Sequence, residues 1–304
     1  MYDLIGDVHG YAKELRQLLE MMGYKSHRGL YKHAERKAIF LGDLINRGPD
    51  SKEVLQIVRP MVQSGHAEAV LGNHELNLMA FYTLNDQNKP LLSHSIRNIL
   101  QLLPVMESFK NAEAELHDYI EWMYSLPLFI EHEDIRVVHA CWQQDSIDFV
   151  RKNFHHKKVN RELMIKIFQQ RGPESKSIHT IIKGPEIPLP KNRRTADAET
   201  VRRGYVRVKW WEDHKGKTYR QISSQSKVKL PNYKIPDNLI NMDLSYPKDA
   251  EPVFIGHYSL NGKPFLLTQN ICCLDFGVSK SGNITAYRWH GEHKLVSKNF
   301  VQIK

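Results

Sequence analysis

The stretch Asp3–Gly10, DLIGDVHG, places two side chains that can bind metal, Asp7 and His9, at the end of what reads as the first strand. Alternate residues of a strand point to the same side. The pattern therefore predicts that Asp7 and His9 project together from the carboxyl edge of that strand. One such pair is weak support for a metal, because an Asp after a strand is usually a turn residue and a buried His usually serves structure. Its meaning depends on whether partners occur elsewhere.

Partners do occur, because four later β-type runs also end in side chains that can bind metal. They are Gly42-Asp43, Gly72-Asn73-His74-Glu75, Gly256-His257, and Val138-His139, which lacks only the leading glycine. Loops that leave the strands of an open α/β sheet converge on one crevice. Carboxylates, an amide oxygen and imidazoles suit Mn²⁺, Fe²⁺ or Zn²⁺, whereas calcium prefers oxygen ligands. Six ligands exceed the need of one open catalytic metal, so we predict two metals that share a carboxylate.

Two metals about 3.5–4 Å apart form a phosphoryl-transfer device, because they activate water and offset the charge that builds up on phosphorus. Arg47, four residues after Asp43, is the candidate clamp for the remaining phosphate oxygens. His74 directly follows Asn73 and is the candidate acid that protonates the leaving oxygen. Glu75 is expected to support the ligands or the start of a helix, and Asp275 is expected to serve a turn.

Hydrophobic periodicity predicts an α/β fold in a single domain over residues 1–304, with mixed sheets flanked by helices. In the first helix, Leu15, Leu18, Leu19 and Met22 share one face, and Gly23 ends it. Asp50 and Glu53 predict a capping box for the second. Residues 82–130 read as a helical insertion. Residues 150–250, rich in Lys, Arg, Pro and His with few clean periodicities, read as a basic cap. Strands are expected again within 252–258, 271–277 and 283–289.

The composition restricts the class of protein. A net charge of +9 suits an anionic partner, either a phosphorylated substrate or nucleic acid, without naming one. No run of about 18 apolar residues predicts a membrane span, and the motif at Asp7 leaves no room for a signal peptide. Cys141, Cys272 and Cys273 make no disulfide framework. We therefore expect a cytoplasmic protein and, without a coiled-coil signal, a monomer.

The motifs GDVHG, GDLINRG and GNHE, followed by His139 and His257, resemble the ordered set of the calcineurin-like metallophosphoesterases, particularly the phosphoprotein phosphatase superfamily. The segments GDLINRGPDSKEVL, LGNHELNLMA and CCLDFGVSKSGNITAYRW look most like its symmetrical diadenosine tetraphosphate hydrolase branch. The likeness is good over about 1–82, 127–142 and 252–289 and poor between. The order of the motifs, more than any single one, makes it specific.

The resemblance implies a role for each of these residues. Asp7, His9 and Asp43 would hold one metal, and Asp43 would bridge to a second metal held by Asn73, His139 and His257. His74 would be the general acid and Arg47 the phosphate clamp. The family also usually supplies a second clamp from the middle of the chain, for which the candidates are Arg203 and Arg207. Tyr258, next to His257, completes the substrate-binding candidates.

One departure from the superfamily concerns Asn46, which stands where its protein phosphatases carry an Asp that orients the catalytic His. Asn46 is expected to accept a hydrogen bond from His74 without supplying a negative charge, and this favours the dinucleotide hydrolase branch. Cys141 either lines the site or, as we favour, is a buried inert thiol. Trp210 and Trp211 either stack a base or belong to the core.

Three functions follow, in order of preference. The first is hydrolysis of phosphate esters or anhydrides with diadenosine tetraphosphate or a related nucleoside polyphosphate as substrate, and with Mn²⁺, Fe or Zn as metals. The alternative within that class is a protein serine/threonine or broad-specificity phosphatase. A nucleic-acid-binding or nucleic-acid-processing protein ranks lower, because the positive charge is not organised into a recognisable binding motif. A scaffold without chemistry is set aside, because all six ligands are present.

Overall fold

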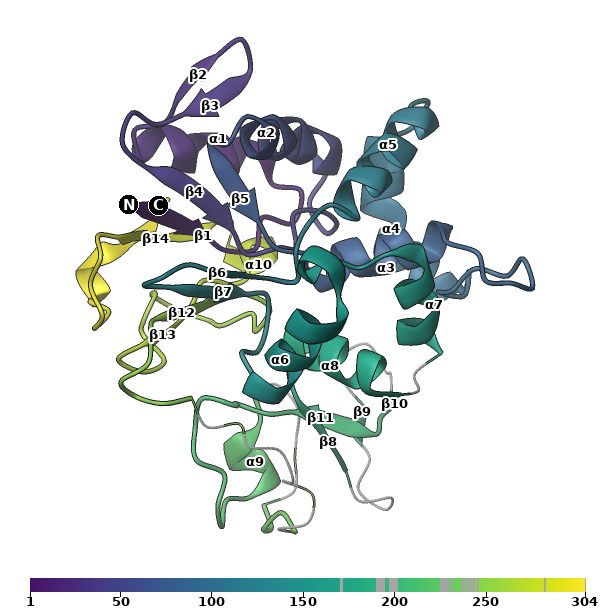
Figure 1. Ribbon diagram of the computed structural model, residues 1–304, viewed down its shortest axis with the longest axis vertical. Coiled ribbons are helices and arrows are strands. Elements are labelled where there is room, and N and C mark those ends of the chain that lie inside the picture. Colours follow the sequence, from purple (N-terminus) through teal and green to yellow (C-terminus); the bar gives the residue numbers. More distant parts are fainter. Residues whose placement is uncertain are drawn as a thin grey trace.

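Two β-sheets form the centre of the protein, with helices outside them (Figure 1). The computed structural model describes residues 1–169, 172–189, 195–196, 202–224, 230, 232–236, 239, 244, 246–281 and 283–303. The first sheet has the order β15-β14-β1-β4-β5, formed by Phe300–Gln302, Thr285–Trp289, Tyr2–Ile5, Lys37–Phe40 and Ala67–Ala69. The second has the order β13-β12-β7-β6, formed by Ile271–Cys273, Val253–Ile255, Arg136–Val138 and Phe129–Glu131.

Both sheets are mixed, and each contains a parallel group. Strands β1, β4 and β5 run parallel, and β14 joins β1 antiparallel, with Tyr2 opposite Trp289. Strands β7, β12 and β13 also run parallel, with β6 antiparallel at the edge. The predicted fold class, mixed sheets flanked by helices, is confirmed. The strands expected near residues 252, 271 and 283 are also present.

The sheets are held together by a buried apolar layer. Leu4 and Ile39 of the first sheet belong to one cluster with Phe254 of the second. The next residue on the first strand, Ile5, belongs instead to the cluster that includes the helices. This alternation follows from the period of two in a strand, and it explains why the strands read as continuous apolar runs: both of their faces are buried.

Helices α1 (Ala12–Met21) and α2 (Ser51–Gln63) lie outside the first sheet (Figure 1). The predicted face of α1 is buried, and Gly23, at φ +88°, follows its end. The predicted capping box of α2 is wrong. The side chain of Asp50 accepts no capping bond, and Glu53 pairs with Arg16 instead. The hydroxyl of Ser51 accepts the Asn46 backbone N–H at 3.0 Å, so the start of α2 supports the loop after β4.

The remaining elements follow in chain order. The helices are α3 Asn73–Tyr82, α4 Ile96–Ser108, α5 Glu113–Met123, α6 Gln144–Asn153, α7 Arg161–Phe168, α8 Gly172–Lys183, α9 Tyr219–Ile222 and α10 Val278–Ser281, with 3₁₀ turns at His155–Lys157 and Ser297–Asn299. The short strands are β2 Lys25–His27, β3 Leu30–Lys32, β8 Glu186–Pro188, β9 Thr195–Ala196, β10 Arg202–Arg203 and β11 Tyr205–Arg207. Helices α7 and α8 lie in the region where few periodicities were expected. Within the described residues, none of the helices is both long and apolar enough to cross a membrane.

The cap, residues 150–250, contacts the loop after β7 through α8 and Trp210. The carbonyl of Ile181 accepts the backbone N–H groups of Ala140 and Cys141, at 2.9 and 3.2 Å. Trp210 is 1% exposed and donates its indole N–H to the Ala140 carbonyl at 2.9 Å. Trp210 therefore belongs to the core and does not stack a base, which were the two roles expected for it. The division of the chain into one domain with two insertions stays a prediction.

Candidate active site

The predicted ligands lie just after the carboxyl ends of five parallel strands, in loops except for Asn73, which is the first residue of α3. They follow β1 (Asp7, His9), β4 (Asp43), β5 (Asn73), β7 (His139) and β12 (His257). One expectation was wrong in detail: β1 ends at Ile5, so Asp7 and His9 lie in the loop after it and not on the strand. The backbone of His9 is left-handed, with φ 49°. This conformation, and not the alternation of a strand, turns the side chain of His9 into the site.

Left-handed backbone recurs at the site. Asp43, Asn46, Arg47 and His257 have φ of 49°, 69°, 67° and 72°. Non-glycine residues adopt this conformation at an energetic cost, and they persist where the surroundings hold them in place. The loops are accordingly tied to one another by backbone hydrogen bonds: the Asp43 carbonyl accepts the N–H groups of Val8 and His9, at 3.1 and 2.8 Å.

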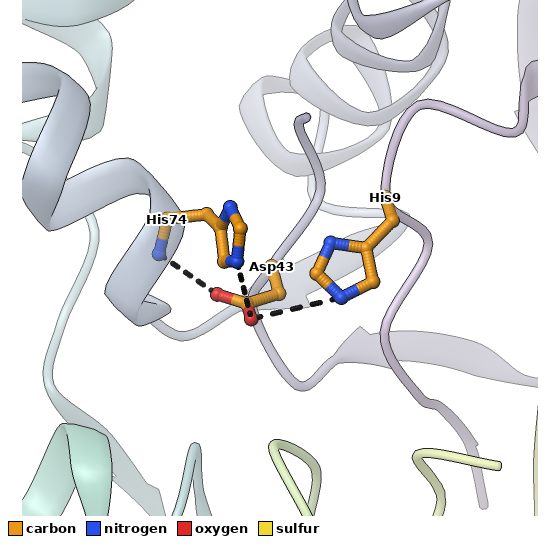
Figure 2. Close-up of side chains that lie close together, drawn as sticks. All are labelled: His9, Asp43 and His74. Carbon is orange, nitrogen blue, oxygen red and sulfur yellow. Dashed lines mark hydrogen bonds and ion pairs between the residues drawn. The ribbon is translucent and has the colours of Figure 1, made fainter. Parts of the chain in front are cut away.

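Asp43 lies at the centre of the site, between His9 and His74 (Figure 2). Its Oδ2 is 3.8 Å from His9 Nε2 and 3.9 Å from His74 Nε2, and its Oδ1 accepts the His74 backbone N–H at 2.9 Å. On the other side, Oδ1 is 3.3 Å from His139 Nε2. Two groups with ligand atoms close enough to hold an ion share this carboxylate: His9, Asp43 and His74, and Asp43, His139 and His257.

Hydrogen bonds to backbone carbonyls determine which ring nitrogen of His9 and of His139 is available to bind a metal. His9 Nδ1 lies 3.2 Å from the Ile45 carbonyl, and His139 Nδ1 lies 2.6 Å from the Leu41 carbonyl. A carbonyl only accepts, so in the neutral imidazole each Nδ1 carries the hydrogen and each Nε2 presents a lone pair. Such carbonyl partners are how proteins orient metal-binding imidazoles.

The resulting arrangement calls for a cation. Among the described residues, His9 Nε2 and His257 Nε2 are buried without a hydrogen-bond partner. The lone pair of His9 Nε2 faces the oxygens of Asp7, at 3.7 Å, and of Asp43. Acceptors turned toward acceptors in a buried place repel one another unless a positive ion lies between them. The donor set therefore fits divalent metals, with nitrogen and oxygen ligands in the proportion that Mn²⁺, Fe²⁺ and Zn²⁺ accept.

The other predicted ligands complete the cluster. Asn73 Oδ1 lies 3.2 Å from His139 Nε2. Both oxygens of Asp7 lie 3.2 Å from the His257 backbone N–H, which links the loops of the two sheets. Burial raises the pKa of Asp7 well above its usual range, and the negative charges of Asp275 and Asp43 raise it further. A bound cation would reverse that effect.

Glu75 holds two loops together, as its expected supporting role required. It is fully buried, and its carboxylate accepts the backbone N–H groups of Asp43 and Leu44 at 2.9 Å, Gly72 at 3.1 Å and Ile45 at 3.2 Å. Burial, with the charge of Asp43, raises the pKa of Glu75 to about 7. Asp275 likewise serves a turn, because it accepts the N–H groups of Ser259 and Gly277 at 2.6 and 2.8 Å.

Asn46 contacts His74, but with the opposite polarity to the one expected. Its Nδ2 lies 3.1 Å from His74 Nδ1, so the amide donates and the imidazole accepts. The hydrogen of a neutral His74 then sits on Nε2, the nitrogen that faces Asp43. Arg47, one residue further, is exposed at the edge of the site. Its charge lowers the pKa values of Asp7 and His9.

The candidate substrate-binding residues Arg203, Arg207 and Tyr258 differ in their surroundings. The side chain of Arg203 lies outside the described residues. Arg207 is half-buried, with Nη2 3.8 Å from Glu186 Oε1. Tyr258 is 5% exposed, and its ring packs against Trp211 at 4.8 Å. Cys141 is buried, and burial raises the pKa of its thiol, as expected of an inert cysteine.

Sequence reasoning missed what two glycines do. A Cβ at Gly72 would lie 2.2 Å from the Asp43 backbone nitrogen, and a Cβ at Gly256 would lie 2.1 Å from Asp7 Oδ1. Each position therefore admits only glycine, because the loops approach too closely for a side chain. The glycine that precedes most of the ligands was the available signal. The carbonyls of Leu41 and Ile45, which orient the imidazoles, leave no trace in the sequence.

The fold and the cluster agree with a sequence comparison. Residues 2–214 match the calcineurin-like phosphoesterase family, and the chain belongs to that family. The class of enzyme predicted from the motifs, a metallophosphoesterase, is thereby confirmed. A protein serine/threonine phosphatase from Saccharomyces cerevisiae shares the fold, with a TM-score of 0.51 at 13% identity, over 99% of this chain and 78% of that one.

Two kinds of relative are similar in sequence. The symmetrical bis(5'-nucleosyl)-tetraphosphatase of Proteus mirabilis is 25% identical, over 99% of this chain and 98% of the relative. The asymmetrical bis(5'-nucleosyl)-tetraphosphatase PrpE of Oceanobacillus iheyensis is 33% identical, but over 45% of this chain and 54% of the relative. The PrpE protein of Halalkalibacterium halodurans is 34% identical, over 48% and 59%. The chain thus spans little more than half the length of these two PrpE relatives.

Proposed function

We propose that this protein hydrolyses nucleoside polyphosphates, with diadenosine tetraphosphate as the first substrate to test and two molecules of ADP as products. The observation that carries the proposal is Asp43, which two groups of imidazoles share in a buried site. The choice of substrate is supported by the relative from Proteus mirabilis, whose likeness extends over nearly the whole of both chains. Cleavage to ADP is preferred to cleavage into ATP and AMP, because the symmetrical relative matches over 99% of this chain, whereas asymmetrical PrpE relatives match over 45%, 48% and, in Bacillus cereus, 80% of it.

The residues would divide the work as follows. Asp7, His9 and Asp43 would hold one metal ion, and Asp43, Asn73, His139 and His257 a second. Two such ions, when bound, activate water near neutral pH and offset the charge that develops on the phosphate. We propose Mn²⁺ as the working metal, with Fe or Zn as alternatives, because all three accept this mixture of nitrogen and oxygen ligands.

The other side chains orient the substrate and move a proton. Arg47, exposed at the edge of the site, would bind phosphate oxygens through its planar guanidinium. His74 would donate the hydrogen on Nε2 to the leaving oxygen. Asn46 would hold the ring of His74 in that tautomer through its 3.1 Å bond to Nδ1. Acid and clamp thus come from the first turn of α3 and from the loop after β4, which Glu75 holds together.

The test is product analysis with Mn²⁺-loaded protein, which receives diadenosine tetraphosphate and a phosphoserine peptide in parallel, with Asp43→Asn protein as the blank. ADP as the only nucleotide product, with the peptide untouched, supports the proposal. Equal amounts of ATP and AMP would make the enzyme asymmetrical. Phosphate released from the peptide alone would make it a protein phosphatase, and would contradict the inference drawn from Asn46.

Two further properties belong to the proposal. Cys141, Cys272 and Cys273 are all buried free thiols, which agrees with a cytoplasmic location. We also propose a monomer, whose partner is an anionic phosphorylated substrate and not a nucleic acid or a membrane. Light scattering coupled to size-exclusion chromatography measures the oligomeric state, and a mass of about twice 35.5 kDa would contradict this proposal.

A further inference from the structure

Trp211 differs from the other four tryptophans of the chain in its exposure. The structure describes all five, and Trp122, Trp142, Trp210 and Trp289 are 6%, 3%, 1% and 5% exposed. Trp211 is only half-buried. A single partly exposed aromatic ring is common on protein surfaces, so it acquires meaning only through its position.

A tight turn fixes the backbone of Trp211. The Glu212 backbone N–H donates to the Lys209 carbonyl at 3.1 Å, which makes Trp210 and Trp211 the two central residues of the turn. The Glu212 carboxylate also pairs with Lys209 at 3.4 Å and with Lys217 at 2.9 Å. Because the same turn anchors Trp210 in the core, Trp211 is held at a defined place in the cap.

A row of aromatic rings connects Trp211 with the predicted metal ligands. The ring of His139 lies edge-to-face against that of His257, with centroids 5.1 Å apart. The centroid of His257 lies 5.6 Å from that of Tyr258, and the centroid of Tyr258 lies 4.8 Å from that of Trp211, each ring nearly perpendicular to the next. Two ring-to-ring steps therefore separate the half-buried indole from a residue that is predicted to bind metal.

Tyr258, the middle ring of this row, has little room to move. It is 5% exposed, and a Cβ added at Gly184 would lie 2.4 Å from its Oη. The φ of Gly184 is +75°, so both the space and the backbone conformation require glycine there. Tyr258 is thus a buried support, and its edge-to-face contact orients the ring of Trp211 before any ligand arrives.

An indole that is oriented in advance and partly exposed near a phosphate-binding site suits a nucleobase. Every base has a π-face, so bases stack on aromatic side chains whatever their identity. In a nucleotide, one ribose separates the base from the phosphates. A base on Trp211 and a phosphate at the loop of His257 can therefore belong to one molecule.

We propose that Trp211 stacks the nucleobase of the substrate, so that the cap binds the base while the metal-binding loops bind the phosphates. This inference rests on the proposed function and deepens it. The ligand class is a nucleoside polyphosphate, recognised by the face of its base. Inorganic polyphosphates and phosphopeptides lack a base and gain nothing from Trp211.

The experiment is calorimetric titration of the Mn²⁺-loaded protein with ADP and with inorganic pyrophosphate, each in excess Mg²⁺. Both ligands carry two phosphates, and they differ by the nucleoside. The variants are Trp211→Ala, which removes the ring, and Trp211→Phe, which keeps a smaller one. The matched control is Tyr233→Ala, because Tyr233 is a 39% exposed ring of the cap that also packs edge-to-face on a tyrosine, Tyr219, at 5.7 Å.

Trp211→Ala should weaken ADP binding about ten- to hundredfold, the usual effect of removing a stacking ring, and leave pyrophosphate binding within about twofold. Trp211→Phe should restore part of the affinity for ADP, and Tyr233→Ala should change neither ligand. Tryptophan fluorescence gives a second measurement. ADP should quench part of the emission of the wild type, and Trp211→Phe should abolish this quenching, because the other four indoles are buried.

Three results would overturn the stacking contact: unchanged ADP affinity in Trp211→Ala, equal losses for ADP and pyrophosphate, or quenching by ADP that persists in Trp211→Phe. Equal losses would make Trp211 a support of the metal-binding loops. If diadenosine tetraphosphate is not hydrolysed but the loss is specific to ADP, the proposed function fails and the stacking contact stands. If it is hydrolysed and Trp211→Ala binds ADP like the wild type, the stacking contact fails and the proposed function stands.

Discussion

The metal-binding loops and the cap are built on different principles. In the loops, each predicted ligand is buried or nearly so, backbone groups of one loop bond to another, and left-handed residues are held in place by their neighbours. The described part of the cap touches these loops through α8, Trp210 and the Gly184 turn. The comparison teaches that the geometry of the loops is over-determined, as the chemistry proposed for them requires, whereas the described part of the cap meets the loops at a few contacts and can vary with less effect on the predicted ligands.

Replacing the shared carboxylate gives the largest effect that this comparison predicts. Asp43→Asn removes the charge that both groups of imidazoles share. We expect turnover of diadenosine tetraphosphate to fall by about a thousandfold or more, the upper range for losing one electrostatic contact with the transition state. Metal analysis after gel filtration should show loss of bound Mn²⁺, and circular dichroism should stay unchanged. Retention of both metals and of activity would remove Asp43 from the centre of the site.

The next largest effect is expected from a methyl group at Gly72, where two of the site's segments approach closely. Gly72→Ala drives a Cβ into the backbone and carboxylate of Asp43. We expect turnover to fall about a hundredfold, because a displacement of about 1 Å in a catalytic group has an effect of this size. The control is Gly29→Ala, where φ is +85° but nothing lies within 4 Å. It should reduce stability by about 1 kcal/mol and leave turnover unchanged. Gly72 itself has φ −92°, so equal activity losses in both variants would show that the effect of Gly72→Ala does not come from its contact with Asp43.

Replacing Arg47, which is exposed at the edge of the site, tests whether its guanidinium binds phosphate. Arg47→Gln should lower kcat for diadenosine tetraphosphate about ten- to a hundredfold with little change in stability, because the side chain is exposed and its role is to bind phosphate. Arg28→Gln is a close control, since Arg28 is also exposed and left-handed, at φ 51°. Steady-state kinetics of both variants settle the matter. If the two behave alike, Arg47 is not a phosphate clamp.

The smallest effect is expected in the cap and concerns stability. Burial, with the charge of Lys183, lowers the pKa of His179 to about 4. An unfolded histidine has a pKa of about 6.5, so the folded protein binds fewer protons between these values and loses stability as the pH falls through them. At pH 5 the loss is about 2 kcal/mol. In urea unfolding at pH 7 and pH 5, His179→Gln should lose this dependence. A wild type and variant whose stabilities fall in parallel would contradict it.

The sequence singled out residues that the structure brings together at Asp43, and it said less about the region around them, for a physical reason. Metal chemistry dictates which residue types and spacings to look for, so Asp43, His139 and His257 could be named one by one as candidate ligands. The left-handed turns at His9 and Asn46 could not, because no side-chain pattern requires them. The polarity of the Asn46–His74 contact depends on the amide orientation, which three-dimensional neighbours decide.

The fold shows the same division. Helix α1 and the central strands follow from periodicity, because their buried faces repeat at regular intervals. The capping box at Asp50 failed because a tertiary ion pair captured Glu53. The cap helix α8 packs against α6 and α7, so the residues that it buries are decided by neighbours in space, and its own sequence gives a weak signal.

The antiparallel pairing of β1 with β14 has a consequence for the order of events during synthesis. Tyr2 faces Trp289, so the strand that leads into Asp7 acquires one of its two neighbours only when the far end of the chain has arrived. Contacts so distant in sequence form slowly. Until then the strand presents an unpaired edge to its surroundings. A nascent chain halted before β14 should therefore be open to proteases near Asp7, and catalytic competence should appear only once β14 has paired with β1.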